Sequence, residues 1–474
     1  MIRIFNTLSG KIEPLPHLSR NKPLRIFVCG PTVYDSSHIG HARTYLVFDA
    51  FVRFLRANGI KVFYLQNITD IDDKIIARAR ESRTTPKLVA SRFTREHLDD
   101  MKHLGITSVN RYARATDFMK EIVKQVERLI AKKFAYLIPG EGYYFEVKKF
   151  KDYGKLARRT DMRPEDGVSR IDESIKKRDP RDFCLWKLQK EKDEPAWNTP
   201  LGKGRPGWHI EDTAISEKFF GARYDVHGGA IDLIFPHHEA EIAQQESVSG
   251  KKPFVKLWMH TGFLIVNGEK MSKSLGNFIT IREFLEKYPA YLFRFFILLF
   301  HWRSPMNFSE ENMEQAEASF ETIQDMMRKA RLVADVKRRN TERTPSLRPI
   351  LKELEDNFTR ALEDNFNTPL AFGALFTALR HIQPHIFALS SKNARAVVAT
   401  FSTLLGCLGI AIPKGTIPLT ITRQVKKREL FRRNKQFIQS DALRKKIESI
   451  GFAMEDTPLG TLIWQKQQKS RPRI

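Results

Sequence analysis

The chain has 474 residues, 42% of them hydrophobic and 28% charged, enough for roughly three domains with sizeable cores. Its net charge of +25 is well beyond what solubility requires, and this excess favours a polyanionic partner such as nucleic acid. Only three cysteines are present, an odd and sparse set that argues against a disulfide framework and indicates a reducing compartment.

We expect neither a secretory signal nor a membrane span. Residues 1–10 lack a continuous apolar core, and no small-residue cleavage site follows them. The most apolar stretch, residues 291–300, is short and contains Arg294, so it predicts a buried helix. The sequence therefore predicts a soluble, cytoplasmic protein.

The first predicted strand, residues 25–29, runs into a Gly30-Pro31 break and then into a helix-like stretch that ends near Asn58. A strand, a turn and a helix N-terminus in this order form an anion site, because free backbone N–H groups and the helix dipole face the turn. His38 and His41 share one face of this helix, and Gly40 lets a nucleotide approach the backbone. The segment predicts a nucleotide-binding turn.

Strand-like and helix-like patterns then alternate from about residue 24 to 306, with a second strand at residues 60–65. This alternation predicts a parallel α/β sheet wound on both faces. Residues from about 120 to 206 look like an insertion, with a helix over 118–133, a hairpin at 140–142 and a charged run rich in Pro and Gly.

A second motif, Lys270-Met271-Ser272-Lys273-Ser274, lies about 230 residues after the histidines, beside an Asn267-Gly268 turn. Its two lysines can clamp a polyphosphate. Each motif alone is weak evidence, but the two in this order are strong evidence for a nucleotide-dependent enzyme.

Three further residues combine donors that suit zinc. Cys29 ends the first strand, and His237 and Glu241 lie four apart, so both can face one way at a helix start. Sulfur, imidazole and carboxylate together form a plausible zinc set.

The C-terminal third turns helical from about residue 309 to 410. Ser309 is placed to cap a helix, and Phe358, Ala361, Leu362 and Phe366 fall at helical spacing. Pro413 to Pro418 read as a linker. Residues 420–474 hold 14 basic and 5 acidic residues. We therefore predict domains over 1–308, 309–415 and 416–474.

The two motifs resemble the signature motifs of the class I aminoacyl-tRNA synthetases. The resemblance implies a Rossmann-type parallel-sheet catalytic domain, an α-helical stem and a small C-terminal anticodon-binding module. It also implies that the enzyme activates an amino acid with ATP and Mg²⁺ and transfers it to the 3′ end of a tRNA. In this family pattern His38 and His41 contact the triphosphate, and Lys270 and Lys273 stabilise the leaving pyrophosphate.

Four stretches narrow the resemblance to the cysteinyl-tRNA synthetase family: residues 4–7, 67–74, 271–278 and 364–369. That family binds the substrate thiol through an active-site zinc. Carried over by position, the ligands of one zinc per chain are Cys29, Asp212, His237 and Glu241. Asp212 departs from the family pattern, which has cysteine there. A carboxylate keeps the ligand charge but is a harder donor, and Asp212 could instead be a helix-start residue without metal contact.

The same resemblance implies further binding residues. Thr32, Thr69 and Trp208 would bind cysteine; the alternative for Trp208 is a buried position in the core. Gly40, His41, His227, Asp232 and Lys273 would bind ATP, with His227 stacked on the adenine. The implied partners are ATP, L-cysteine and tRNA(Cys), bound by a monomer.

The basic C-terminal module is the predicted reader of the anticodon, with Trp464 or Phe452 stacking on an unpaired base. Its phosphate-binding candidates are Arg432, Arg433, Lys435, Arg444, Lys445 and Lys446.

Two other functions stay open at this point. An ATP-dependent ligase that joins cysteine to an amino sugar resembles the catalytic half, but it has no need of a basic C-terminal module. A non-catalytic RNA-binding relative would have no use for His38, His41, Lys270 and Lys273 together.

Overall fold

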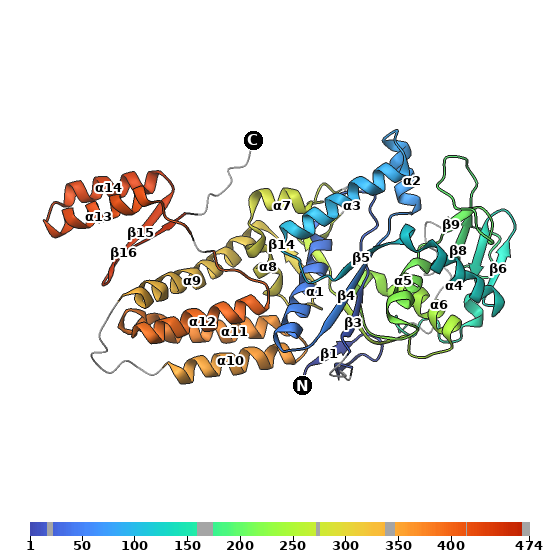
Figure 1. Ribbon diagram of the computed structural model, residues 1–474, viewed down its shortest axis with the longest axis horizontal. Coiled ribbons are helices and arrows are strands. Elements are labelled where there is room, and N and C mark those ends of the chain that lie inside the picture. The colour runs from blue at the N-terminus through green and yellow to red at the C-terminus, as the bar shows by residue number, and fades with distance from the viewer. Residues whose placement is uncertain (17–21, 159–173, 272–274, 337–346, 414, 467–474) are drawn as a thin grey trace. The chain divides into compact units, whose positions relative to one another are not determined.

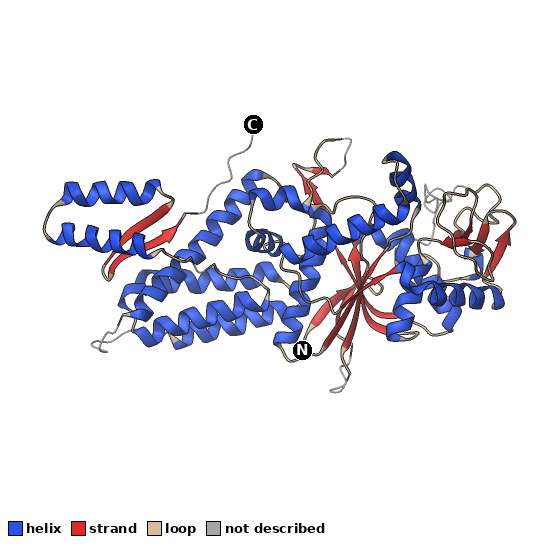
Figure 2. Ribbon diagram, turned by 45° about the horizontal axis from the view of Figure 1, so that its top comes forward, coloured by secondary structure: helices blue, strands red, loops and turns tan. Residues whose placement is uncertain are grey.

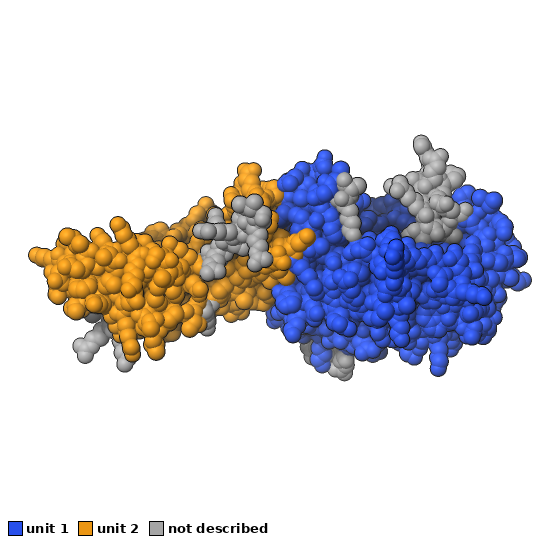
Figure 3. All heavy atoms as spheres, turned by 90° about the horizontal axis from the view of Figure 1, so that it is seen from above, with its two compact units in different colours: residues 1–282, 300–308, 363–367 blue, residues 283–299, 309–362, 368–474 orange. Residues whose placement is uncertain are grey.

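The computed structural model describes residues 1–16, 22–158, 174–271, 275–336, 347–413 and 415–466. Ser272, Lys273 and Ser274 lie outside this part of the chain. The chain divides into two compact units, which Figure 3 colours blue and orange. Unit 1 holds residues 1–282, 300–308 and 363–367, and unit 2 holds residues 283–299, 309–362 and 368–474. The three predicted domain boundaries remain predictions.

A five-stranded parallel sheet, ordered β11-β10-β3-β4-β5, forms the centre of unit 1 (Figure 1). Its strands are β3 (Leu24–Val28), β4 (Val62–Ile68), β5 (Arg111–Arg114), β10 (Tyr224–Ala230) and β11 (Val255–Thr261). Figure 2 shows the twist of this sheet and helices on both of its sides. The predicted parallel α/β sheet is confirmed.

Apolar packing fixes one helix on each side of the sheet. Helix α1 (Ile39–Ala57) packs Phe48 so closely on Gly228 of β10 that a Cβ there would lie 2.2 Å from the ring. On the other side, Phe63 of β4 packs on Phe220 of α5 (Ile210–Phe220), with ring centroids 5.8 Å apart. The remaining helices of the sheet region are α2 (Asp73–Glu81), α3 (Pro86–His103) and α6 (Glu239–Ser249).

The chain starts with an antiparallel hairpin, β1 (Arg3–Asn6) and β2 (Lys11–Pro14), which the sequence did not predict. Residues 363–367, distant in sequence, bind to this hairpin. Asn365 accepts a hydrogen bond from the backbone N–H of Phe5 at 2.9 Å, and its carbonyl accepts one from the indole N–H of Trp302 at 2.8 Å. These bonds explain why residues 363–367 return to unit 1.

The insertion folds as helix α4 (Met119–Ala131) and a four-stranded antiparallel sheet. Its strands are β6 (Ala135–Ile138), β7 (Gly142–Phe145), β8 (Phe183–Leu188) and β9 (Gly204–Pro206). The hairpin predicted at residues 140–142 joins β6 to β7 and is confirmed.

A small sheet, ordered β13-β12-β14, leads into the second motif. It consists of β12 (Leu264–Val266), β13 (Glu269–Lys270) and β14 (Met306–Phe308). The Asn267-Gly268 turn between β12 and β13 has φ values of 50° and 83°, a conformation that suits glycine. The predicted turn is confirmed.

Unit 2 is mainly helical. Its helices up to the linker are α8 (Ala290–Leu298), α9 (Glu310–Asp335), α10 (Arg348–Glu363), α11 (Thr368–Ile382) and α12 (Ser391–Cys407), and α7 (Ile281–Lys287) joins it to unit 1. Ser309 caps α9 as predicted, by accepting from the N–H of Asn312. The prediction for Phe366 is wrong, because α10 ends at Glu363 and the φ of Phe366 is +46°. Helix α8 is buried as predicted, and among the described residues no helix is long and apolar enough to cross a membrane.

The C-terminal module packs helices α13 (Leu419–Arg433) and α14 (Phe437–Ser449) on a hairpin of β15 (Phe452–Thr457) and β16 (Gly460–Gln465). Phe452 is 7% exposed and lies in the core of this module, so the idea that it stacks on a base is wrong. The ring of Trp464 lies against the guanidinium of Arg328, 4.6 Å away.

An ion pair between the buried Arg428 and the exposed Asp456 should make the C-terminal module sensitive to acid. Arg428 donates two hydrogen bonds to Asp456, at 2.6 and 2.8 Å, and these hold the pKa of that carboxyl at about 2. Because the folded pKa is below the unfolded value of about 3.9, the stabilisation is complete above that pH and is lost as pH falls towards 2. Amide hydrogen exchange of β15 and β16 between pH 5 and 2 should show this loss.

Asp456→Asn should remove that pH-dependent part of the protection, whereas Asn at the exposed Asp441 should not. Equal pH profiles for the native chain and Asp456→Asn would contradict the assignment.

Candidate active site

The two histidines of the first motif lie at the N-terminus of α1, after the turn that follows β3. His38 is the N-cap of α1: its Nδ1 accepts from the N–H of Gly40 at 3.1 Å, and the Nδ1 of His41 accepts from the N–H of His38 at 3.4 Å. Both rings therefore carry their proton on Nε2. Burial lowers the pKa of His38 to about 4 and lowers the pKa of His41 well below its usual value. At neutral pH the pair offers two neutral N–H donors.

The structure brings Met271 of the second motif to the N-terminus of α1. A Cβ on Gly40 would lie 2.9 Å from the Cε of Met271, so the side chain of Met271 lies against the backbone of the first motif. Lys270 is exposed, with its Nζ 5.1 Å from the centre of the Phe263 ring. The predicted role of Lys273 falls outside the described residues.

The four predicted zinc ligands meet in one buried cluster. Cys29 follows β3, Asp212 is on α5, His237 lies within the helical turn Ile234–His238, and Glu241 is on α6. Asp212 Oδ2 lies 3.1 Å from both Cys29 Sγ and His237 Nε2, and His237 Nε2 lies 3.3 Å from Glu241 Oε1. All four donor atoms lie within 4.8 Å of one another.

This cluster is suited to a cation. Burial raises the pKa of the Cys29 thiol well above its usual value, and the neighbouring Asp212 and Glu241 raise it further. Burial and Asp212 likewise raise the pKa of Glu241, whose Oε2 has no hydrogen-bond partner among the described residues. One cysteine sulfur, one imidazole and two carboxylates whose donor atoms lie this close together are a donor set that zinc accepts. The residues present therefore fit a zinc ion.

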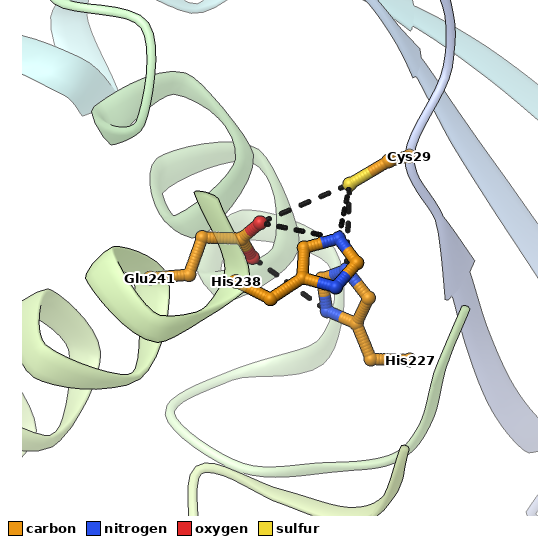
Figure 4. Close-up of side chains that lie close together, drawn as sticks. All are labelled: Cys29, His227, His238 and Glu241. Carbon is orange, nitrogen blue, oxygen red and sulfur yellow. Dashed lines mark hydrogen bonds and ion pairs between the residues drawn. The ribbon is translucent and has the colours of Figure 1, made fainter. Parts of the chain in front are cut away.

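Two more histidines adjoin the same cluster, as Figure 4 shows. His227, His238, Cys29 and Glu241 also place donor atoms within 4.8 Å of one another. His238 Nε2 is 3.0 Å from Cys29 Sγ, and its Nδ1 is 2.8 Å from His260 Nε2. Both sets share Cys29 and Glu241, so they form one continuous cluster of donor atoms. The sequence analysis missed His238 and His260; the signal available was the pair of adjacent histidines.

Asn67 of β4 orients the unusual ligand. Its side-chain amide donates to Asp212 Oδ1, and its Oδ1 accepts from the N–H of Gly30 at 2.6 Å. The other oxygen of Asp212 is thereby left facing Cys29 and His237. Asn67 is part of a motif that the sequence analysis quoted, but this role depends on pairing across the sheet.

The predicted cysteine-binding residues surround the cluster. Thr32 and Thr69 form an isolated β-bridge, and the hydroxyl of Thr69 donates to Glu211, the neighbour of Asp212. Trp208 is half-buried, with its ring stacked on His237 at a centroid distance of 4.4 Å.

Two other predicted ATP-binding residues, His227 and Asp232, differ in their exposure to solvent. His227 is fully buried between Phe27 and Trp258, with ring centroids 5.1 and 4.4 Å away. This packing favours a role in the buried cluster over the expected stacking on adenine. Asp232 is exposed, in the short helical turn Ile231–Leu233 after β10.

Comparisons with known proteins agree with this geometry. Residues 16–318 match the family "tRNA synthetases class I (C) catalytic domain", and residues 357–412 match the DALR domain. The chain is similar to the cysteine–tRNA ligase of Caldicellulosiruptor saccharolyticus, with 40% identity over 98% of this chain and 99% of that protein. It is 42% identical to the cysteine–tRNA ligase of Thermoplasma volcanium, over 98% of this chain and 100% of that protein.

Solved structures resemble the fold at lower identity. The methionyl-tRNA synthetase of Mycobacterium tuberculosis, in complex with methionyl-adenylate, superposes with a TM-score of 0.61 and 17% identity. The match covers 82% of this chain and 90% of that one. It supports the Rossmann-type class I fold.

Proposed function

The chain belongs to the cysteine–tRNA ligase family of class I aminoacyl-tRNA synthetases, and we propose that it activates L-cysteine with ATP and transfers it to tRNA(Cys). The observation that carries the proposal is the meeting of both signature motifs at Gly40, on the same sheet edge as a buried thiol–imidazole–carboxylate cluster. The full-length similarity to cysteine–tRNA ligases supports it. We further propose a cytoplasmic monomer.

We assign one zinc per chain to Cys29, Asp212, His237 and Glu241. Zinc bound there would accept the substrate thiolate and disfavour the hydroxyl of serine, which a shaped pocket alone separates by only ~10²-fold. Asn67 holds Asp212 in the orientation that this requires. Trp208, stacked on His237, would close over the bound amino acid, and Thr32 and Thr69 would hold its polar groups.

Adenylation would run by positioning and charge stabilisation. The cysteine carboxylate attacks the α-phosphorus of ATP, and pyrophosphate leaves with its Mg²⁺. His38 and His41 donate their Nε2–H groups to phosphate oxygens, while Gly40 lets the nucleotide approach the backbone. Lys270 and Lys273 stabilise the charge that develops on pyrophosphate, and Asp232 is the candidate partner of the ribose.

In the second step, the terminal ribose hydroxyl of the tRNA attacks the carbonyl carbon of cysteinyl-adenylate, and AMP leaves. The C-terminal module is the proposed anticodon reader. Arg432, Arg433, Lys435, Lys445 and Lys446 are exposed there, and Arg444 is partly exposed. An enzyme that joined cysteine to an amino sugar would not need this surface, and a non-catalytic protein would not need the two motifs.

ATP–pyrophosphate exchange measured with each of the twenty amino acids tests the proposal. Cysteine alone should support fast exchange, and tRNA(Cys) should then become charged. Exchange with another amino acid, or with none, would overturn it.

Removal of residues 420–474 should leave cysteine activation intact and weaken tRNA charging. The proposed adenylation residues all lie upstream, whereas the lost segment holds 14 basic against 5 acidic residues. We expect the KM for tRNA to rise at least about tenfold, with a weaker dependence on salt. Serine at the exposed Arg433, Lys435 and Lys445 should reproduce part of the effect without removing the module. Equal charging by the truncated and full-length chains would remove the anticodon assignment.

A further inference from the structure

Arg43 lies on α1, two residues after the first motif, and is only 2% exposed. Its guanidinium donates from Nη1 to the carbonyl of Phe263 and from Nη2 to the carbonyl of Ser304. Burial lowers its pKa to about 10, and no carboxylate among the described residues counters that effect. A buried cation held by carbonyls alone is costly, so its contacts point to a positional role.

The two carbonyls come just before β12 and β14, two strands of the small sheet that leads into the second motif. Phe263 joins β11 to β12, and its carbonyl also accepts from the N–H of Met306 on β14 at 2.9 Å. Its ring lies beneath Lys270, whose Nζ is 5.1 Å from the ring centre. The guanidinium therefore fixes the start of the arm that carries Lys270 and Met271.

A neighbouring contact strengthens this attachment. The hydroxyl of Thr44, the next residue on α1, lies 2.8 Å from the hydroxyl of Thr261 at the end of β11. Arg43 and Thr44 together attach Thr261, Phe263 and Ser304 to α1, the helix of the first motif.

The other end of the second motif is also attached to α1. The N–H of Ile39 donates to the carbonyl of Ile279 at 3.1 Å, and the N–H of Ile281 donates to the carbonyl of Ser37 at 2.9 Å. Both flanks of the second motif are thus bound to the residues around His38 and His41. Of these attachments, those at Arg43 and Thr44 depend on side chains that can be replaced without changing the histidines.

We propose that Arg43 is a positioning residue, which through Phe263 and Ser304 sets the second motif against the first for the departure of pyrophosphate. Among the described residues, its side-chain hydrogen bonds go to Phe263 and Ser304 and not to His38, Gly40, His41 or the proposed zinc ligands. The guanidinium suits this task because its N–H groups have a fixed planar geometry and can bind two carbonyls at once, which a lysine does less well. The proposal rests on the adenylation function proposed above.

The test compares the two steps of the reaction in Arg43→Met and Arg43→Lys. We expect the kcat for cysteine-dependent ATP–pyrophosphate exchange to fall about 10²-fold in Arg43→Met, because displacements of about 1 Å near reacting groups cost that much. The KM for cysteine, the zinc content and the transfer of cysteine from preformed cysteinyl-adenylate to tRNA should stay within about twofold. Arg43→Lys should recover part of the rate.

Two further variants serve as a second probe of the same attachment and as a control. Thr44→Val is nearly isosteric, removes the contact with Thr261, and should lower exchange in the same selective way by a smaller factor. Arg53→Met, which removes a guanidinium bound to Asp49 on the same helix, should leave exchange unchanged. If exchange and transfer fall together, or if only the KM for cysteine rises, Arg43 is structural or acts elsewhere. Absence of cysteine-dependent exchange in the native protein would overturn the proposed function instead.

Discussion

Replacing Lys273 by alanine should lower the rate of cysteine-dependent ATP–pyrophosphate exchange by about 10²–10³-fold and leave the affinity for cysteine nearly unchanged. The charge of this lysine is needed most when pyrophosphate departs, so its loss raises the energy of the transition state more than that of the bound substrates. The described neighbours support this role, because Met271 lies against Gly40 and both flanks of the motif are bound to α1.

Pre-steady-state measurement of adenylate formation, together with cysteine binding at equilibrium, separates the two effects. Lys270→Ala should cost less, since Lys270 is exposed and its Nζ lies over the ring of Phe263. Alanine at Lys251, an exposed lysine outside both motifs, is the matched control. An unchanged rate in Lys273→Ala would remove this residue from the mechanism.

The parts of the fold that the sequence predicted correctly are those formed by one continuous segment of the chain. The apolar run before Gly30 and the helix after His38 predicted β3 and α1, because strand, turn and helix follow one another within a few dozen residues. The hairpin β1–β2 could not be predicted in the same way, since it is completed by Asn365, which lies 360 residues away from Phe5. The prediction that Phe366 belongs to a helix is wrong for the same reason. Its ring packs on that of Phe51 on α1, with centroids 5.2 Å apart, and this distant contact overrides the helical spacing.

In the candidate site, too, some residues could be predicted from the sequence and others depend on contacts between distant segments. Donor chemistry and spacing indicated Cys29, His237 and Glu241, the family resemblance added Asp212, and the structure brings the four together. The contacts of His238 and of Asn67 arise from pairing between strands and helices distant in sequence, so no local pattern could indicate them. His227 shows the converse, because a residue carried over for adenine stacking lies fully buried against Trp258.

Asp212→Ala should lose zinc and the preference for cysteine over serine together. The native protein should hold about one zinc per chain, and without the carboxylate only three of the four proposed ligands remain. Asp212→Cys should instead hold zinc more tightly than the native chain, by about tenfold or more, since sulfur is the softer donor. Competition with a chelator, elemental analysis and exchange rates with cysteine and serine measure these effects.

Asn67 provides the sharper form of this test. Asn67→Ala keeps all four proposed ligands but frees Asp212 Oδ1, so zinc affinity should fall by about 10–100-fold, as is usual when a group that orients a metal ligand is removed. The combination of Asn67→Ala with Asp212→Cys should lose less, because a thiolate has no second oxygen to orient. Asp232→Ala, at an exposed carboxylate outside the cluster, should leave zinc content unchanged. If active native enzyme contains no metal, or if Asp212→Ala keeps both zinc and selectivity, then Asp212 is not a ligand and its bond to Asn67 only ties α5 to β4.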